Sequence, residues 1–220
     1  MNQTVVVFDL DRTITKIDTY LLFLSFLILK NMFRVIAIPS LLISVLRYRF
    51  GNRTNTWLKE DFWAAIVKNR DISEIKNLGE KFSIFVCKNL IRPGAIKAIE
   101  AHKSAGHHLI LASASFDVYV TPIATRLGFN ATICTKAEIS NDGALTGKIH
   151  GKNCYAEEKV LQINLYTKTT GMLNHKKVAY SDHHSDVDLL IWADKATAVH
   201  PTHQLKTMAE KHNFLIEKTW

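Results

Sequence analysis

The chain has 220 residues, of which 47% are apolar and 22% charged. This is enough for one α/β core with a smaller appendage, but short for two full-sized domains. Its three cysteines form no CxxC pair, which argues against a disulfide framework or a structural zinc site and favours a reducing cytoplasm. The net charge of +8 attracts phosphate esters, anionic lipid and nucleic acid alike, so composition does not choose among these partners.

Residues 5–8 are a short β-branched run, which predicts a buried parallel strand. Residues 1–4 before it contain no basic n-region, so we expect no cleavable signal peptide. Asp9 and Asp11 follow the strand, at the end where open α/β sheets place their ligand sites. Carboxylates two positions apart on extended chain point the same way, which is tolerated when a cation lies between them or one keeps a proton. A polar turn is the plain alternative for this motif alone.

Residues 15–90 predict a helical insertion between the first strand and the rest of the core. Two apolar runs come first, at residues 20–29 and 35–46. Residues 55–88 then place large apolar side chains near helical spacing. Arg92-Pro93-Gly94 marks the return to the core, because Pro and Gly together favour a turn.

The two apolar runs have basic flanks and no acidic residue, since no Asp or Glu occurs between residues 19 and 59. The basic residues around them are Lys30, Arg34, Arg47, Arg49 and Arg53. Neither run reaches the roughly 20 residues of a spanning helix, and a joined span would place cations in mid-membrane at a few kcal/mol each. Residues 19–53 therefore suit an interfacial hairpin at an anionic bilayer. A buried helical cap and a homodimer interface remain open as alternatives.

From residue 95 onward, predicted helices and strands alternate. The helices are expected at residues 95–104, 118–127, 155–165, 187–192 and 205–212, the strands at 109–112, 177–180 and 196–199, and a β-hairpin around 141–147. Such alternation implies a parallel sheet covered by helices on both faces. We therefore predict a Rossmann-like α/β core made of residues 1–14 and 91–220, with residues 15–90 as an inserted α-helical cap.

Three further polar clusters follow, or stand beside, predicted strands. Ser113-Ala114-Ser115 comes directly after a strand, where small residues let backbone N–H groups approach an anion. Lys159 lies on a predicted helix, and a lone helical lysine is nearly always a solvated charge. Asp182 and Asp186 stand four positions apart and suit a hard cation, although a helix capped by Ser185 or Asp186 is the plain alternative.

Together and in this order, the four clusters resemble the haloacid dehalogenase superfamily. Its members combine a DxDxT nucleophile motif, a Ser or Thr after the second strand, a Lys and a DxxxD motif. The resemblance covers nearly the whole chain and is closest to the phosphoserine-phosphatase-like branch, whose helical cap follows the first motif. Residues 93–95, 113–116, 153–160 and 180–182 look like the bacterial subgroup that includes phosphatidylglycerophosphatase C.

The resemblance implies a Mg²⁺-dependent phosphatase with an aspartyl-phosphate intermediate. Asp9 would be the nucleophile, and Asp11 would protonate the leaving alkoxide and then take a proton from water. Mg²⁺ would bind Asp9, the backbone carbonyl of Asp11, and Asp182, with Asp186 in support. The phosphoryl group would be held by Thr13, Ser113, Ala114, Ser115 and Lys159.

The sequence departs from the family pattern at three places that bear on the substrate. Arg12 stands where many members have Gly, Ser115 replaces a second Gly, and His183-His184 fills a stretch that is often Gly and Ala. None of these changes removes a reacting group, but together they argue against phosphoserine.

The expected substrate is an anionic lipid phosphate, with phosphatidylglycerol phosphate as the best single choice. Such an enzyme would be cytoplasmic, and peripheral or monotopic on the cytoplasmic face of the inner membrane if residues 19–53 engage lipid. The rivals are a phosphatase of a small soluble metabolite such as phosphoserine, a non-turnover phospho-accepting regulator and an inactive membrane scaffold. No nucleic-acid motif accompanies the positive charge, so we expect no nucleic-acid partner.

Overall fold

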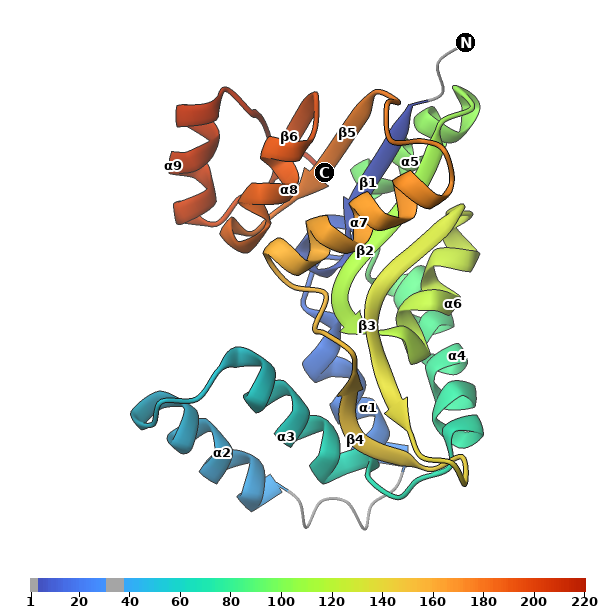
Figure 1. Cartoon of the computed structure of the whole chain (residues 1–220), viewed down its shortest axis with the longest axis vertical. Coiled ribbons are helices and arrows are strands. Elements are labelled where there is room, and N and C mark those ends of the chain that lie inside the picture. The colour runs from blue at the N-terminus through green and yellow to red at the C-terminus, as the bar shows by residue number, and fades with distance from the viewer. Residues whose placement is uncertain (1–3, 31–37) are drawn as a thin grey trace.

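A computed structural model describes residues 4–30 and 38–220 of the chain (Figure 1). In these residues seven strands form one sheet in the order β4-β3-β2-β1-β5-β6-β7. The strands are β1 (Val5–Asp9), β2 (His108–Phe116), β3 (Ala131–Ile139), β4 (Leu145–His150), β5 (Lys177–Ser181), β6 (Lys195–Val199) and β7 (Leu215–Glu217). All neighbours pair in parallel except the hairpin β3–β4, which confirms the predicted α/β fold with its mainly parallel sheet.

The described helices agree with the predicted alternation. They are α1 (Thr19–Lys30), α2 (Ile38–Phe50), α3 (Asn55–Val67), α4 (Ile72–Asn89), α5 (Pro93–Ser104), α6 (Asp117–Leu127), α7 (Glu157–Thr169), α8 (Val187–Trp192) and α9 (His203–His212). Local chemistry sets several of their ends. The Thr54 side chain accepts a hydrogen bond from the Trp57 amide at the start of α3, and Gly128 adopts a φ of 76° where α6 ends. Strand β7 was not predicted, because three residues are too few to show a pattern.

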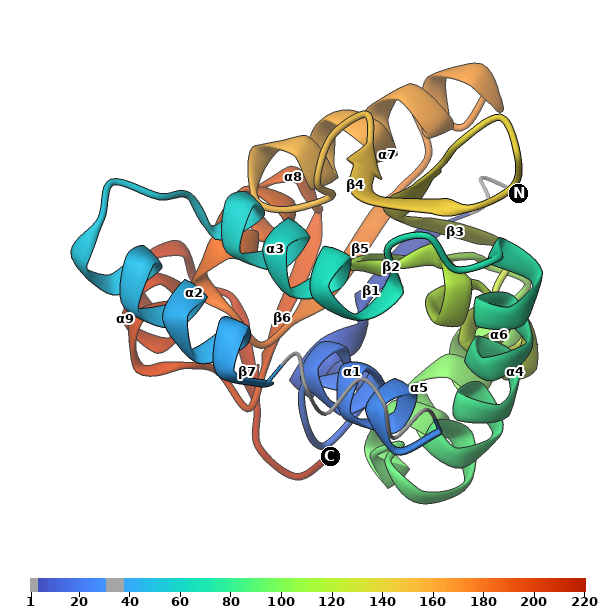
Figure 2. The same ribbon diagram turned by 90° about the horizontal axis from the view of Figure 1, so that it is seen from below.

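Alternate residues of β1 point into two separate cores, as the pleat of a strand requires. Val6 and Phe8 pack with side chains from α1, α3, α4, α5 and α6. Val5 and Val7 pack on the opposite face with side chains from α7, α8 and α9. The sheet is therefore covered on both faces, and the carboxyl end of β1 lies at its centre (Figures 1 and 2).

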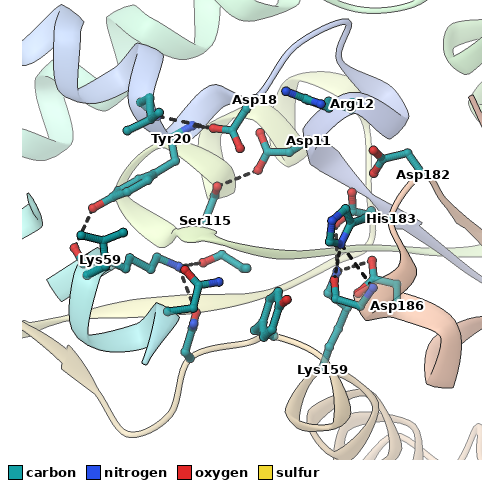
Figure 3. Close-up of a pocket in the computed structure, with 18 of the residues that line it drawn as sticks. Asp11, Arg12, Asp18, Tyr20, Lys59, Ser115, Lys159, Asp182, His183 and Asp186 are labelled. Carbon is teal, nitrogen blue, oxygen red and sulfur yellow. Dashed lines mark hydrogen bonds and ion pairs between the residues drawn. The ribbon is translucent and has the colours of Figure 1, made fainter. Parts of the chain in front are cut away.

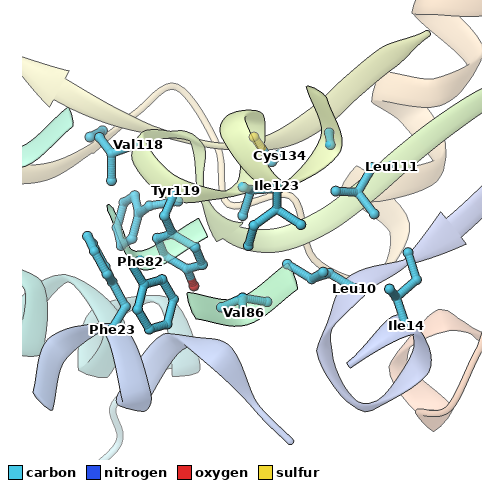
Figure 4. Packing of buried hydrophobic residues seen from close by; sticks show 14 of the residues in the cluster. Leu10, Ile14, Phe23, Phe82, Val86, Leu111, Val118, Tyr119, Ile123 and Cys134 are labelled. Carbon is cyan, nitrogen blue, oxygen red and sulfur yellow. The ribbon is translucent and has the colours of Figure 1, made fainter. Parts of the chain in front are cut away.

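Helix α1 packs into the first of these cores through aromatic side chains (Figure 4). The ring of Phe23 lies 4.5 Å from that of Tyr119 and 5.0 Å from that of Phe82, measured between centroids. Gly79 of α4 faces the Val118 carbonyl of α6 so closely that a side chain there would clash. The helices of the predicted cap segment therefore share a core with the sheet.

Helices α1 and α2 contain most of the two apolar runs. The beginning of the second run and the predicted link between the runs, with Arg34, lie outside the described residues. Within the described part of the chain, no helix is both long and apolar enough to cross a bilayer.

Candidate active site

The first polar cluster lies in a tight turn at the carboxyl end of β1. Residues Leu10–Ile14 form this turn, in which Arg12 adopts a φ of 59°. That left-handed conformation favours glycine, which gives a physical reason for the residue type common at this position. Asp9 is buried, and its Oδ2 accepts a hydrogen bond of 3.1 Å from the Thr13 hydroxyl. The same hydroxyl lies 3.3 Å from Oδ1 of Asp182.

Lys159 is not a solvated surface charge but a buried amine in the same site. Its Nζ donates to Oδ1 of Asp9 at 2.9 Å and to Oδ2 of Asp186 at 2.7 Å. Ser181 also donates to Asp186, at 2.7 Å. Burial lowers the pKa of Lys159, but the charges of Asp186 and Asp9 together raise it by more. The net shift is therefore upward, and the amine stays protonated.

Asp11 is held by the start of the cap segment and by the carboxyl end of β2. The amide and the hydroxyl of Thr19 both donate to its Oδ1 at 2.6 Å, and Ser115 donates to its Oδ2 at 2.7 Å. Burial raises the pKa of Asp11, and the nearby charge of Asp18 raises it further. A carboxyl group in this setting keeps a proton more readily than one in water.

These side chains border a pocket of about 580 Å³ (Figure 3). The core side of the lining contains Asp9, Asp11, Arg12, Ala114, Ser115, Asn153, Tyr155, Lys159, Asp182, His183, Ser185 and Asp186. The side formed by α1, α2, α3 and the segments next to them contains Asp18, Tyr20, Leu21, Val45, Asn55, Leu58, Lys59 and Phe62. Of the predicted site residues, Thr13 and Ser113 are fully buried behind this lining. The structure thus brings together every predicted site residue, although the sequence separates them by up to 177 positions (186 − 9).

Lys59 is the main site residue that the sequence interpretation missed. Its Nζ reaches across from α3 and donates to the Ala114 carbonyl, to Oδ1 of Asn153 at 2.9 Å and to the Thr135 hydroxyl at 3.4 Å. Desolvation lowers its pKa to about 8. The signal was in the sequence, because Lys59 stands three and four positions before Phe62 and Trp63, on an apolar helix face.

The carboxylates of the site fit a hard cation such as Mg²⁺. Burial, together with repulsion from Asp186 and Asp11, raises the pKa of Asp182 to about 7. Burial is also the largest cause that raises the pKa of Asp9. Among the described residues no three Asp, Glu, His or Cys side chains gather as a ready metal cage, and the convergent pair is Asp9 with Asp182. That pair suffices chemically, because Mg²⁺ is typically held by one or two carboxylates together with water and phosphate oxygens.

The sequence model of the haloacid dehalogenase-like hydrolases matches residues 6–190. The chain belongs to this family. This hydrolase is 29% identical over 191 residues to Protein CicA of Caulobacter vibrioides, and the aligned residues cover 86% of this chain and 83% of that protein. It is also 28% identical over 152 residues to Phosphoserine phosphatase SerB1 of Mycobacterium tuberculosis, covering 69% of this chain but only 49% of SerB1.

Solved structures share the fold of this hydrolase. A protein of unknown function from Bordetella pertussis Tohama I matches with a TM-score of 0.87 and 23% identity, over the whole of both chains. A substrate-bound phosphoserine phosphatase complex matches with a TM-score of 0.67 and 18% identity, over 100% of this chain and 95% of that one. At these identities the likeness shows the fold alone, and it agrees with the predicted resemblance to the phosphoserine-phosphatase-like branch.

Proposed function

We propose that this hydrolase is a Mg²⁺-dependent phosphomonoesterase that forms a phosphorylated intermediate on Asp9. One observation carries the proposal: Asp9, Lys159 and Asp182 meet at the carboxyl end of the central strand. Lys159 donates to Asp9, and the Thr13 hydroxyl lies within hydrogen-bonding distance of both Asp9 and Asp182. Asp186 adds a third buried carboxylate beside Lys159. Burying three carboxylates with one amine costs folding free energy, and groups perturbed in this way mark functional sites.

In the proposed reaction, Asp9 attacks the phosphorus atom, and the bond from phosphorus to the ester oxygen breaks. Asp11 gives its proton to the leaving alkoxide, a role that its raised pKa suits. Water then attacks the aspartyl phosphate, Asp11 takes the water's proton, and inorganic phosphate leaves while the Asp9 carboxylate is restored. Bound at Asp9, the Asp11 carbonyl and Asp182, with Asp186 in support, Mg²⁺ would offset the repulsion between carboxylate and phosphoryl group.

The remaining predicted residues would bind the phosphoryl group and shape the site. Lys159 would balance the charge of the transferring group, aided by Thr13, Ser113 and the backbone N–H groups of Ala114 and Ser115. Residues 15–90 would form the cap that selects the leaving group, over a core of residues 1–14 and 91–220.

For the substrate we propose an anionic lipid phosphate, with phosphatidylglycerol phosphate as the first choice, hydrolysed at the cytoplasmic face of the inner membrane. Support comes from the cap side of the pocket, where Leu21, Val45, Leu58 and Phe62 offer apolar surface to a leaving group. A small soluble ester such as phosphoserine is the second candidate. It is favoured by the name of the relative SerB1 and by the amine of Lys59, which would suit a carboxylate on the leaving group.

A phosphate-release screen tests the substrate. Purified protein is assayed with Mg²⁺ or with EDTA on phosphatidylglycerol phosphate, phosphatidic acid, phosphoserine and phosphocholine. We expect the highest kcat/KM on phosphatidylglycerol phosphate and no release in EDTA. A faster reaction with phosphoserine would replace the lipid proposal with the second candidate, and turnover in EDTA would contradict the metal.

Two substitutions test the chemistry. Asp9→Asn should abolish phosphate release. Asp11→Asn should slow both steps, so that phosphoenzyme accumulates during the reaction and is detected by its label after acid quenching. Asp194→Asn is the matched control, because Asp194 is exposed and accepts a hydrogen bond from the Lys177 amide at the start of β5, the opposite end of that strand from Asp182. Retained turnover in the Asp9 variant would refute the nucleophile, whereas rapid multiple turnover in the Asp11 variant would refute its acid–base role.

A further inference from the structure

Helix α2 exposes a continuous apolar face. The exposed fractions of Leu42, Ile43, Leu46 and Phe50 are 63%, 49%, 54% and 80%. These residues stand at positions i, i+1, i+4 and i+8, so they share one side of the helix. Side chains of this size normally bury much of their surface, and an exposed group of them marks an interaction site.

The opposite side of α2 is fixed to the rest of the protein. Ser44 is only 4% exposed, and its hydroxyl donates to the carboxylate of Asp61 on α3. Val45 lines the pocket described above. Both ribbon views place α2 at the outer edge of the molecule, with α3 between it and β4 (Figures 1 and 2). The apolar face is therefore held outward by contacts on its other side.

Cations border this face. Arg47 and Arg49 follow Leu46 at positions that put one arginine on each side of the apolar strip. Both are exposed, and within residues 38–220 neither forms an ion pair. The sequence from residue 19 to residue 59 contains no acidic residue that could balance them. An apolar strip edged by free arginines is the arrangement of helices that lie in a bilayer interface, where the cations reach lipid phosphates.

We propose that this α2 face, formed by Leu42, Ile43, Leu46, Phe50, Arg47 and Arg49, docks on the surface of an anionic lipid bilayer. A second copy of the chain fits less well. A symmetric contact through the same face would bring arginine towards arginine, with no carboxylate on the helix to compensate. An anionic surface supplies both an apolar layer and the opposite charge.

Docking in this way bears on how a substrate reaches the site. Because Val45 of the same helix lines the pocket, a bilayer held by the outer face of α2 lies next to the side of the pocket that would take the leaving group. This consequence rests on the proposed lipid phosphatase activity, whereas the docking itself is measured without any substrate.

Flotation with vesicles tests the docking. We expect the protein to float with vesicles of phosphatidylglycerol and phosphatidylcholine, much less with phosphatidylcholine alone, and less at high salt. Leu42→Ser with Leu46→Ser should lower the partition coefficient at least ~10-fold, because two leucines no longer enter the apolar layer. Arg47→Gln with Arg49→Gln should lower it about 5-fold for each arginine removed.

The matched control is Leu161→Ser with Leu165→Ser on α7. These leucines also stand four positions apart, and their exposed fractions of 58% and 64% are close to the 63% and 54% of Leu42 and Leu46. Circular dichroism and hydrolysis of a water-soluble phosphate ester check that all variants fold alike. The control pair should leave flotation unchanged.

Three results would overturn the docking: no flotation of the unaltered protein with anionic vesicles, an equal loss in the α7 control, or no loss in the α2 variants. If light scattering instead shows a dimer that dissociates when the α2 leucines are replaced, and vesicles are not bound, the α2 face binds a second copy of the chain and the bilayer proposal is wrong. Flotation without phosphate release in the substrate screen would contradict the proposed activity and leave the docking intact.

Discussion

The two walls of the pocket differ in chemistry and in how the chain fixes them. The core wall presents buried charges: Asp9 ends β1, Asp182 directly follows β5, and the amine of Lys159 on α7 is fixed by its hydrogen bond to Asp9. The cap wall presents mainly apolar side chains from three helices, together with the amine of Lys59 and the polar side chains of Asp18 and Asn55. Strand ends in a hydrogen-bonded sheet hold atoms more rigidly than helices joined by loops. In the proposed function, the reaction would therefore depend on side chains fixed around the strand ends, and the choice of substrate on the cap helices.

The largest effect is expected from Lys159→Met, which tests the role of the core wall. Removing the amine leaves Asp9 and Asp186 buried beside each other without a cation, so we expect a loss of about 3–5 kcal/mol in the free energy of unfolding. Turnover should fall by roughly 10²–10³ on every substrate, because a group that stabilises the transferring charge is gone. Urea denaturation and phosphate release measure the two effects.

Lys152→Met provides the comparison for Lys159→Met. Lys152 pairs with Glu158 at 3.1 Å, but its side chain is 74% exposed. A surface pair of this kind contributes about 0–1 kcal/mol, so the control should change neither stability nor turnover appreciably. A stable, active Lys159→Met protein would mean that the core wall does not depend on its buried cation.

In the cap wall the largest effect should come from Phe23→Ala in α1. Phe23 is fully buried against Tyr119 and Phe82, so its truncation should cost about 3–5 kcal/mol of stability. Leu29→Ala on the same helix removes a side chain that is 72% exposed and should stay within about 0.5 kcal/mol. If Phe23→Ala and Leu29→Ala lowered the thermal midpoint equally, α1 would not be anchored in the core.

The sequence predicted the core wall almost completely. Buried parallel strands show as β-branched runs, and polar clusters at their carboxyl ends must meet at one edge of the sheet, so Asp9 and Asp182 are expected neighbours. Lys159 was assigned through the family resemblance alone, because a lysine on a helix shows no pattern that separates a buried amine from a solvated one.

The cap wall was harder to predict because its two apolar runs look alike in sequence. Both suited an interfacial hairpin, yet Phe23, Leu24 and Leu27 of α1 are at most 3% exposed, so for α1 the alternative of a buried helix holds. Helix α2 has a similar composition and keeps its outer face exposed. Partners distant in sequence, such as Tyr119, decide between these outcomes, and apolar content does not reveal them.

A smaller effect is expected in the pH dependence of stability, which arises from Asp182 in the core wall. Because the pKa of Asp182 rises from 3.8 to about 7 on folding, the folded protein binds this proton more tightly than the unfolded chain. The resulting stability is complete below about pH 4 and is lost as pH rises through 7. Without metal, the free energy of unfolding should therefore fall by on the order of 1–3 kcal/mol between pH 4.5 and 7.5.

Mg²⁺ should offset this loss, so its stabilising effect on the thermal midpoint should be larger at pH 7.5 than at pH 5. Asp182→Asn should flatten both the pH dependence and the response to Mg²⁺. If the metal stabilised the protein equally at both pH values, Asp9 and Asp182 would not be its ligands.

Lys59→Met should give the smallest effect and the one most specific to the cap wall. Lys59→Met removes a charge that desolvation disfavours, with a pKa lowered to about 8, but it also removes the donor to the Ala114 carbonyl and Asn153. Because the two effects oppose each other, the thermal midpoint at pH 7 should change little. Figure 3 shows Lys59 across the pocket from Lys159, so it would meet the leaving group rather than the phosphoryl group. We expect KM to rise about 10-fold with kcat nearly unchanged, since binding is lost equally in ground and transition states. Lys68→Met is the control, because Lys68 is exposed and follows the carboxyl end of the same helix. A fall in kcat at constant KM would instead assign Lys59 to the reacting atoms, and the separation of chemistry from substrate choice would fail at that residue.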